Sequence, residues 1–307
     1  IQISKLFYER FIANGEISLF SPHDVPGLYD AFGTDSFDDL YVRYESDKFT
    51  PRKTIGAQEL ILDILKERAE TGRLYLMNID HCNSHSSFKD KVYMSNLCQE
   101  ITLPTKPLQH IDDPNGEIAL CILSAVNVGK VSKKDELEEI CDLAVRGLEE
   151  LVDYQEYPVV AAELSTKNRR SLGIGYIGLA HYLAKQGEHY DDPNAWKLVH
   201  DLSESFQYYL LKASNAIAKE KGKCGYFDRT KYADGILPID TYKRDIDEFC
   251  GTELNHDWDS LRTSIATYGL RHSTLSAQMP SESSSVVSNA TNGIEPPRAF
   301  LSTKKSK

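Results

Sequence analysis

Asn96, Cys98 and Glu100 place an amide, a thiol and a carboxylate at alternate positions of one short segment. If this segment is extended, the three side chains leave the same face of the chain and converge on a small volume. Together they could bind a substrate, abstract an atom and accept a proton. A strand with one buried cysteine is the simpler alternative. Cysteine–histidine hydrolysis stays open but unsupported, because no histidine stands near Cys98 in the sequence.

A second candidate site is the serine cluster at residues 281–285, which follows an expected strand at residues 273–278. Hydroxyl groups and backbone N–H groups just beyond a strand can surround an anion, particularly where a helix begins. Composition alone nevertheless favours a plain serine-rich turn with a helix cap. The carboxylate of Glu282 would also have to point away from a bound anion.

The glycines of residues 173–178 match the spacing of a dinucleotide-binding fingerprint, GxGxxG. They follow the polar residues 168–171, however, whereas the fingerprint requires a hydrophobic strand before its first glycine. We therefore interpret these glycines as positions where a helix packs closely, and not as a nicotinamide site.

His81, Cys82 and His85 resemble metal ligands in type and spacing. The asparagine and serine residues among them favour a polar loop over residues 81–87, and no second ligand pair follows. We expect hydrogen bonding within a loop here and no metal site.

Helices and buried strands must position these residues. Apolar residues recur at helical spacing at residues 3–12, 57–69, 134–154, 195–221 and 258–268. Short apolar runs predict strands at residues 74–79, 118–126 and 273–278. The run at 118–126 is typical of a strand covered on both faces, and the helix after it completes an α/β signature. Without an internal repeat or linker, the sequence predicts a single α/β domain over residues 1–307.

The composition restricts the class of protein. The 307 residues are 41% hydrophobic and carry a formal net charge of -11, which predicts a globular chain that does not bind nucleic acid. No apolar run is long enough to span a membrane, so we expect a cytoplasmic protein. The six cysteines include no CxxC pair, which favours reduced thiols. The sequences at Ile1 and Lys307 do not resemble natural domain boundaries, so we expect a fragment or one product of a divided protein.

Five motifs, taken in order, resemble one enzyme family. They are NLCQEI at residues 96–101, LPTKPL at 103–108, GEIALC at 116–121, MPSESS at 279–284 and SNATNGIEPP at 288–297. They are similar to the large, catalytic (α) subunit of class Ia ribonucleoside-diphosphate reductase, most of all to its bacterial and phage branch. The resemblance covers nearly the whole chain. It implies a ten-stranded α/β barrel, of which this chain supplies the middle and later portions, with Cys98 on a central finger loop.

The same resemblance implies roles for individual residues. Cys98 would become a thiyl radical that removes the 3′ hydrogen of a ribonucleoside diphosphate, Glu100 would take the 3′-hydroxyl proton, and Asn96 would orient the substrate. Cys121 matches the second cysteine of the reducing pair, whose partner lies upstream in the family and has no counterpart here. The loop that holds the pyrophosphate aligns with the serine cluster, which reverses its interpretation as a plain turn. The residues expected to bind substrate are Asn96, Leu97, Cys98, Gln99, Glu100, Pro280, Ser281, Glu282, Ser283, Ser284 and Ser285.

The resemblance also implies partners outside this chain. No cofactor or metal would be bound directly by it; the radical would come from a small subunit with a diiron–tyrosyl centre, and ATP or deoxynucleotide effectors would bind an N-terminal region. Complementary large-subunit segments, thioredoxin or glutaredoxin as reductant, and a homo-oligomeric complete enzyme are further expectations. Two alternatives stay open. The first is an inactive barrel remnant that acts as a structural or regulatory assembly partner. The second is a cobalamin-dependent radical reductase, which the long form of the SNATNGIEPP motif disfavours.

Overall fold

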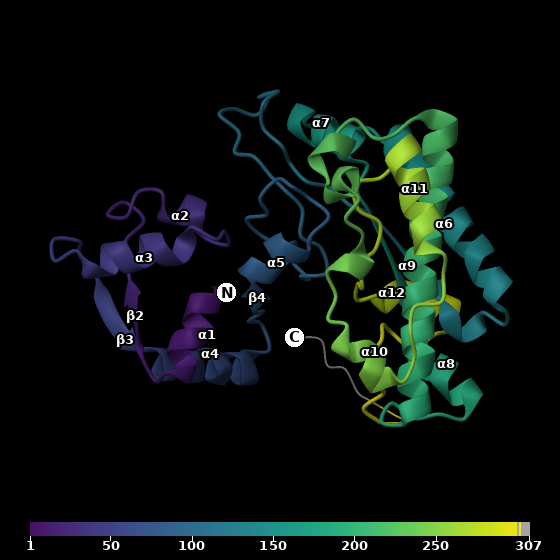
Figure 1. The fold of residues 1–307 in the computed structure, drawn as a ribbon, viewed down its shortest axis with the longest axis horizontal. Helices are drawn as coiled ribbons and strands as arrows, with labels where there is room; N and C mark the ends of the chain where they lie inside the picture. Colours follow the sequence, from purple (N-terminus) through teal and green to yellow (C-terminus); the bar gives the residue numbers. More distant parts are fainter. Residues whose placement is uncertain (300, 302–307) are drawn as a thin grey trace. The chain divides into compact units, whose positions relative to one another are not determined.

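The computed structural model describes residues 1–299 and 301 and divides the chain into two compact units (Figure 1). The first unit comprises residues 1–86 and 91–104, and the second comprises residues 87–90 and the chain from residue 105 onward. Both contain helices and strands, so the predicted mixed α/β composition is confirmed. The described strands form three two-stranded sheets. The single domain over residues 1–307 and the ten-stranded barrel stay predictions.

The first unit combines two small cores with two short sheets. Its elements are β1 (Gln2–Ile3), α1 (Lys5–Ile12), β2 (Glu16–Leu19), α2 (Leu28–Ala31), α3 (Phe37–Ser46), β3 (Lys53–Gly56), α4 (Ala57–Thr71), β4 (Met77–Asn78) and α5 (Ile79–His85). β2 pairs antiparallel with β3, and β1 pairs parallel with β4. The apolar stripes of α1 and α4 close over β2 through Phe7, Ile17 and Ile61. The helices predicted at residues 3–12 and 57–69 are therefore confirmed.

The predicted polar loop at residues 81–87 is wrong for most of its length, because α5 continues to His85. The Asn83 side chain bonds the backbone of Val92 on both sides: its Oδ1 accepts from the Val92 N–H at 2.8 Å and its Nδ2 donates to the Val92 carbonyl at 3.1 Å. Nδ2 also donates to the Ile79 carbonyl one turn earlier at 3.1 Å, so the amide group is satisfied while its residue stays helical. Of the strand predicted at residues 74–79, only Met77–Asn78 (β4) are extended and paired.

The second unit is built around one long helix. Its elements are β5 (Ile122–Asn127), α6 (Lys134–Tyr154), α7 (Val160–Arg169), β6 (Leu172–Ile177), α8 (Leu179–Gln186), α9 (Pro193–Lys221), α10 (Asp245–Cys250), α11 (Trp258–Tyr268) and α12 (Glu282–Ser288), with short 3₁₀ turns between them. α9 packs against α6 and α11 (Figure 1), and their facing residues form the largest core of the described chain. The three helices predicted in this region are confirmed.

β5 and β6 are parallel and in register from Ile122 opposite Leu172 to Asn127 opposite Ile177. α6 and α7 make the crossover between them, which confirms the predicted strand-then-helix signature. The strand begins four residues later than predicted. It is also not covered on both faces, since Leu123 is 41% exposed. The strand predicted at residues 273–278 appears as an extended segment that joins β6 through one parallel bridge, between Ile174 and Ser276.

The interpretation of residues 173–178 as a site of close helix packing is wrong in its secondary structure for all but Gly178, because residues 173–177 lie in β6 and only Gly178 borders a helix, as the N-cap residue of α8. The close packing itself is present. A Cβ atom at Gly173 would lie 2.5 Å from Leu123 Cδ2, and one at Gly175 would overlap the carbonyl oxygen of Ala277. The glycines therefore admit neighbouring chain segments on both sides of a strand.

Among the described residues, no helix combines the length and the apolar character needed to cross a membrane. Within residues 1–299 and 301, no cluster of three or more histidine, cysteine or acidic side chains could hold a metal ion. His81 and His85 lie on one face of α5 with their ring centres 5.6 Å apart.

Candidate active site

Residues 95–102 of the first unit form a tight hairpin. Ser95 and Thr102 make an antiparallel bridge. Inside it, the Asn96 N–H donates to the Ile101 carbonyl at 3.2 Å, and the Ile101 N–H donates to Asn96 Oδ1 at 3.1 Å. The Asn96 side chain thus takes the place of a backbone acceptor and closes the turn.

The expectation that Asn96, Cys98 and Glu100 share a face of an extended segment is wrong. Gln99 has a φ of +65°, a left-handed conformation that a non-glycine residue rarely adopts, and its N–H donates to the Asn96 carbonyl at 3.2 Å. The alternation of a strand is therefore lost between residues 96 and 101. The structure still brings the three residues together, at the tip of one hairpin.

The hairpin tip presents the thiol and isolates one carboxylate oxygen. Cys98 is exposed, whereas the other five cysteines are buried or half-buried, and Leu97 beside it is 89% exposed. Glu100 Oε2 is buried and has no hydrogen-bond partner among the described residues. A buried carboxylate oxygen without a partner costs free energy, so it would gain from a hydroxyl donor. The tip therefore combines an accessible S–H group with an acceptor that lacks its donor.

Burial distinguishes the other thiols of the chain from Cys98. It raises the pKa of the Cys141 thiol to about 12 and that of the Cys224 thiol to about 11, and it also raises the pKa of Cys82. Cys141 and Cys224 are core residues of the second unit. Such thiols stay protonated and inaccessible, which fits a structural role for these two core cysteines.

In the second unit, Cys121 immediately precedes β5 and lies against β6. Its Sγ would be 3.0 Å from a Cβ atom at Gly173, so only a residue without a side chain leaves room for the sulfur there. The Cys121 thiol contacts the carbonyl of Ile122 at 3.8 Å. The beginning of β5 therefore fixes the position of this thiol relative to β6.

The serine cluster begins α12 with Ser281 as the N-cap residue, but the helix cap that its composition predicted is wrong in detail, because the Ser281 side chain makes no capping hydrogen bond. The Ser281 N–H donates to Asn292 Oδ1 at 2.7 Å, and the Ser285 N–H donates to the Ser281 carbonyl at 2.7 Å. The hydroxyls of Ser284 and Ser285 donate to carbonyls of the same turn, at 3.2 and 2.8 Å. The Ser281 hydroxyl is different: it is buried and has no hydrogen-bond partner among the described residues. A ligand that reached this buried hydroxyl could engage it.

Two asparagines that we did not single out from the sequence hold the ends of this turn. Asn292 accepts the Ser281 N–H at the start of α12, and Asn127, the last residue of β5, donates from Nδ2 to the Ser288 carbonyl at its end, at 3.2 Å. The SNATNG motif contains Asn292 and was a usable signal. Asn127 had none, because only the parallel pairing of β5 with β6 brings it to this edge.

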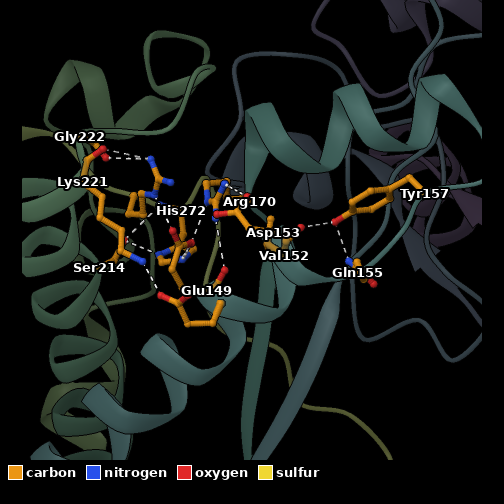
Figure 2. Close-up of polar contacts among 12 residues, drawn as sticks. Glu149, Val152, Asp153, Gln155, Tyr157, Arg170, Ser214, Lys221, Gly222 and His272 are labelled. Atoms are coloured by element: carbon orange, nitrogen blue, oxygen red, sulfur yellow. Dashed lines mark hydrogen bonds and ion pairs between the residues drawn. The ribbon is translucent and has the colours of Figure 1, made fainter.

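A buried charge cluster lies where β6 and the segment 274–277 begin, and Figure 2 shows its polar contacts. Glu149 of α6 is 1% exposed and accepts hydrogen bonds from Arg170 and Arg271 at 2.7 Å and from His272 Nε2 at 3.0 Å. Arg170 also pairs with Asp153. Arg170 lies two residues before β6 and His272 lies just before the segment 274–277, so the cluster joins both to α6.

The pKa values of this cluster follow from burial and hydrogen bonding. Burial opposes the charged form of Glu149, but hydrogen bonds from His272, Arg170 and Arg271 outweigh it and lower the pKa to about 2. Burial lowers the pKa of His272, against the opposing hydrogen bond and charge of Glu149. A neutral His272 fits its contacts, since Nε2–H donates to Glu149 and Nδ1 accepts from the Ser214 hydroxyl at 2.9 Å.

Comparison with known proteins decides the family. The sequence model of the family described as "Ribonucleotide reductase, barrel domain" matches residues 1–307. The chain belongs to this ribonucleotide reductase family. Its resemblance to the large subunit of ribonucleoside-diphosphate reductase is thereby confirmed.

Curated relatives of this ribonucleotide reductase barrel chain carry the corresponding name. The chain is 58% identical to the ribonucleoside-diphosphate reductase subunit alpha of Haemophilus influenzae and 56% identical to ribonucleoside-diphosphate reductase 1 subunit alpha of Escherichia coli. It is 42% identical to the subunit alpha of Enterobacteria phage T4. Each alignment covers 100% of this chain but only 41% of the relative. The ribonucleotide reductase chain described here thus spans well under half the length of these relatives.

Proposed function

We propose that this chain is the catalytic portion of a class Ia ribonucleoside-diphosphate reductase and that it reduces ribonucleoside diphosphates to 2′-deoxyribonucleoside diphosphates. The observation that carries the proposal is the hairpin tip, where an exposed Cys98 accompanies a Glu100 oxygen that lacks a donor. Membership of the ribonucleotide reductase family supports the same proposal. In the complete enzyme, this hairpin would be the finger loop at the centre of a ten-stranded α/β barrel.

The reaction would begin at Cys98. A Cys98 thiyl radical would take the hydrogen atom from C3′ of the substrate, and Glu100 would accept the proton of the 3′-hydroxyl. A neutral S–H group suits hydrogen-atom exchange, whereas a thiolate would act as a nucleophile. The Asn96 side chain has its Oδ1 engaged by Ile101, which leaves its Nδ2 hydrogens to bond a substrate hydroxyl.

The 2′-hydroxyl would then leave as water, with two electrons and two protons supplied by Cys121 and a partner thiol from outside this chain. These two thiols would close a disulfide, and Cys98 would return its hydrogen atom to C3′ and become a radical again. The sum is one ribonucleoside diphosphate and one dithiol converted to one deoxyribonucleoside diphosphate, one disulfide and one water. Thioredoxin or glutaredoxin would reduce the disulfide for the next turnover.

The diphosphate of the substrate would lie at the start of α12, against Pro280–Ser285. The first N–H groups of a helix have no acceptor in their own helix, so those of Ser283 and Ser284 suit an anion. The buried Ser281 hydroxyl would add a further donor. Hydrogen bonds to a charged phosphate contribute about 1.5–3 kcal/mol each, enough for a few of them to determine where the substrate binds.

The experiment is reconstitution with omission of single components. This chain, combined with complementary large-subunit segments, a small subunit carrying a diiron–tyrosyl radical, and a thioredoxin system, is expected to convert CDP to dCDP. Omission of either the small subunit or the reductant should limit product to at most about one turnover. Glu100→Gln should lower kcat by about two orders of magnitude or more, because the base is lost. Complete reconstitution without any dCDP would instead favour an inactive remnant.

A further inference from the structure

The glycine motif of β6 lies between the two groups that the proposed function uses in the second unit. β5, which begins just after Cys121, pairs with one edge of β6. The segment 274–277 bonds the other edge: the Ile174 N–H donates to the Leu275 carbonyl at 2.8 Å, and the Ala277 N–H donates to the Ile174 carbonyl at 3.2 Å. This segment continues through Met279 directly into the serine cluster. β6 is therefore the common neighbour of the reducing thiol and the diphosphate loop.

Gly173 faces the cysteine, and both glycines face Ala277 of the segment that leads into the serine cluster. A Cβ atom at Gly173 would lie 2.5 Å from Leu123 Cδ2 and 3.0 Å from both Cys121 Sγ and Ala277 Cβ. A Cβ atom at Gly175 would overlap the carbonyl oxygen of Ala277 and lie 3.1 Å from Met279 Sδ. Neither glycine has a positive φ, so the requirement is for space and not for a special backbone conformation.

We propose that Gly173 and Gly175 are positioning residues, Gly173 for the Cys121 thiol and Gly175 for the loop at residues 280–285. The inference rests on the proposed function, which it extends to a motif with no assigned role. The absence of two side chains on β6 allows the cysteine and the diphosphate loop to approach the same strand, and so sets the distance between the thiol and the bound diphosphate.

The two positions differ in what must move, and this difference makes the inference testable. At Gly173 the nearest atoms belong to side chains: those of Leu123 and Cys121 can rotate away from a methyl group, and the Ala277 Cβ atom at 3.0 Å must give by only a few tenths of an ångström. At Gly175 the obstructing atom is the backbone oxygen of Ala277, which cannot yield without moving the chain that leads into Pro280. The first change should affect reduction, and the second should affect substrate binding.

The test compares Gly173→Ala and Gly175→Ala with Gly147→Ala as the matched control. Gly147 lies within α6, and a Cβ atom there meets nothing within 4 Å. In the reconstituted enzyme, Gly173→Ala should lower kcat on the order of tenfold or more with KM for CDP within about twofold of wild type. Gly175→Ala should raise KM for CDP on the order of tenfold or more. Gly147→Ala should match the wild type.

A second measurement does not need turnover. In the 307-residue chain itself, the rate of Cys121 alkylation by iodoacetamide, followed by peptide mass mapping, should change at least about threefold in Gly173→Ala, since the methyl group displaces Sγ and so alters its accessibility. It should be unchanged in Gly175→Ala and Gly147→Ala. If Gly173→Ala fails to fold, the double variant with Leu123→Ala removes the nearest clash while it keeps the methyl group beside the thiol.

Equal changes of kcat and KM in the two variants, or wild-type alkylation of Cys121 in a folded Gly173→Ala protein, would overturn the inference. The outcome is separable from that of the proposed function. A wild-type enzyme that makes dCDP while the two glycine variants behave alike contradicts only the positioning role. A wild-type chain that never makes dCDP contradicts the function, and the alkylation rates still test the geometry.

Discussion

Replacing Glu149 with glutamine tests the buried charge cluster that ties β6 and the segment 274–277 to α6. The pKa of Glu149 is lowered from 4.5 to about 2. Since one pKa unit corresponds to about 1.4 kcal/mol, the folded state favours its carboxylate by about 3 kcal/mol. Glutamine would leave the two guanidinium groups of Arg170 and Arg271 with only the Asp153 carboxylate, which pairs with Arg170 alone. Removing one partner of a buried ion pair costs about 3–5 kcal/mol. We therefore expect Glu149→Gln to lower the free energy of unfolding by about 3 kcal/mol or more.

Tryptophan fluorescence during urea unfolding measures this change in the correct unit. The two tryptophans of the chain, Trp196 and Trp258, both lie in the second unit. Glu150→Gln is the matched control, because the neighbouring Glu150 is 71% exposed and pairs with Lys221 at the surface. An exposed pair of this kind contributes about 0–1 kcal/mol. If the two variants unfold at the same urea concentration, the reasoning about the buried cluster is refuted.

The same cluster predicts the pH dependence. The pKa of Glu149 is lowered in the folded state, so its stabilisation is present above pH 4.5 and is lost as the pH falls toward about 2. The pKa of His272 is also lowered from 6.5, so below that pH the unfolded chain binds a proton that the folded chain excludes. His272 makes the second unit less stable as the pH falls below 6.5, and Glu149 adds to this loss below about pH 4.5. In Glu149→Gln the loss of stability below pH 4.5 should be smaller than in the wild type.

Three further substitutions probe other parts of the fold. Asp257→Ala removes the side chain that accepts the Ser260 N–H at the start of α11, and should cost about 1 kcal/mol by tryptophan fluorescence; an unchanged midpoint would argue against this cap. Tyr41→Phe removes a buried hydroxyl that bonds both the N–H and the carbonyl of Ser18 at 2.7 Å, and should cost about 1–3 kcal/mol in the first unit by circular dichroism, whereas no change would contradict the contact. Leu210→Ala empties a site that is 0% exposed in the core of the second unit and should cost about 2–5 kcal/mol; a loss under 1 kcal/mol would contradict its burial.

The sequence predicted the elements that have a strong pattern of their own. The helices α9 and α11 follow from their long apolar periodicity, and the parallel pairing of β5 follows from an apolar run before a helix. β6 was missed as a strand because its glycines carry no side-chain pattern. Its conformation is set by neighbours more than forty residues away on either side, namely β5 and the segment 274–277.

The candidate site shows the same division. Residue types alone selected Cys98 and Glu100, and the family resemblance supplied their roles. The geometry of the tip could not be predicted, because it depends on a left-handed Gln99 and on the Asn96 side chain acting as a backbone acceptor. The charge cluster around Glu149 could not be predicted from the sequence either. Its members come from four separate segments, which lie together only because the second unit folds.

Replacement of the Cys98 thiol by a hydroxyl tests the central claim most directly. In the reconstituted enzyme with CDP, the small subunit and the thioredoxin system, Cys98→Ser should form no dCDP above background, because the strong O–H bond of serine cannot replace the S–H group in hydrogen-atom exchange. Cys250→Ser, which alters a half-buried cysteine of α10, should keep the wild-type rate. The measurement is dCDP formed per enzyme over many turnovers. Wild-type dCDP formation by Cys98→Ser would contradict the assignment of Cys98 as the hydrogen abstractor.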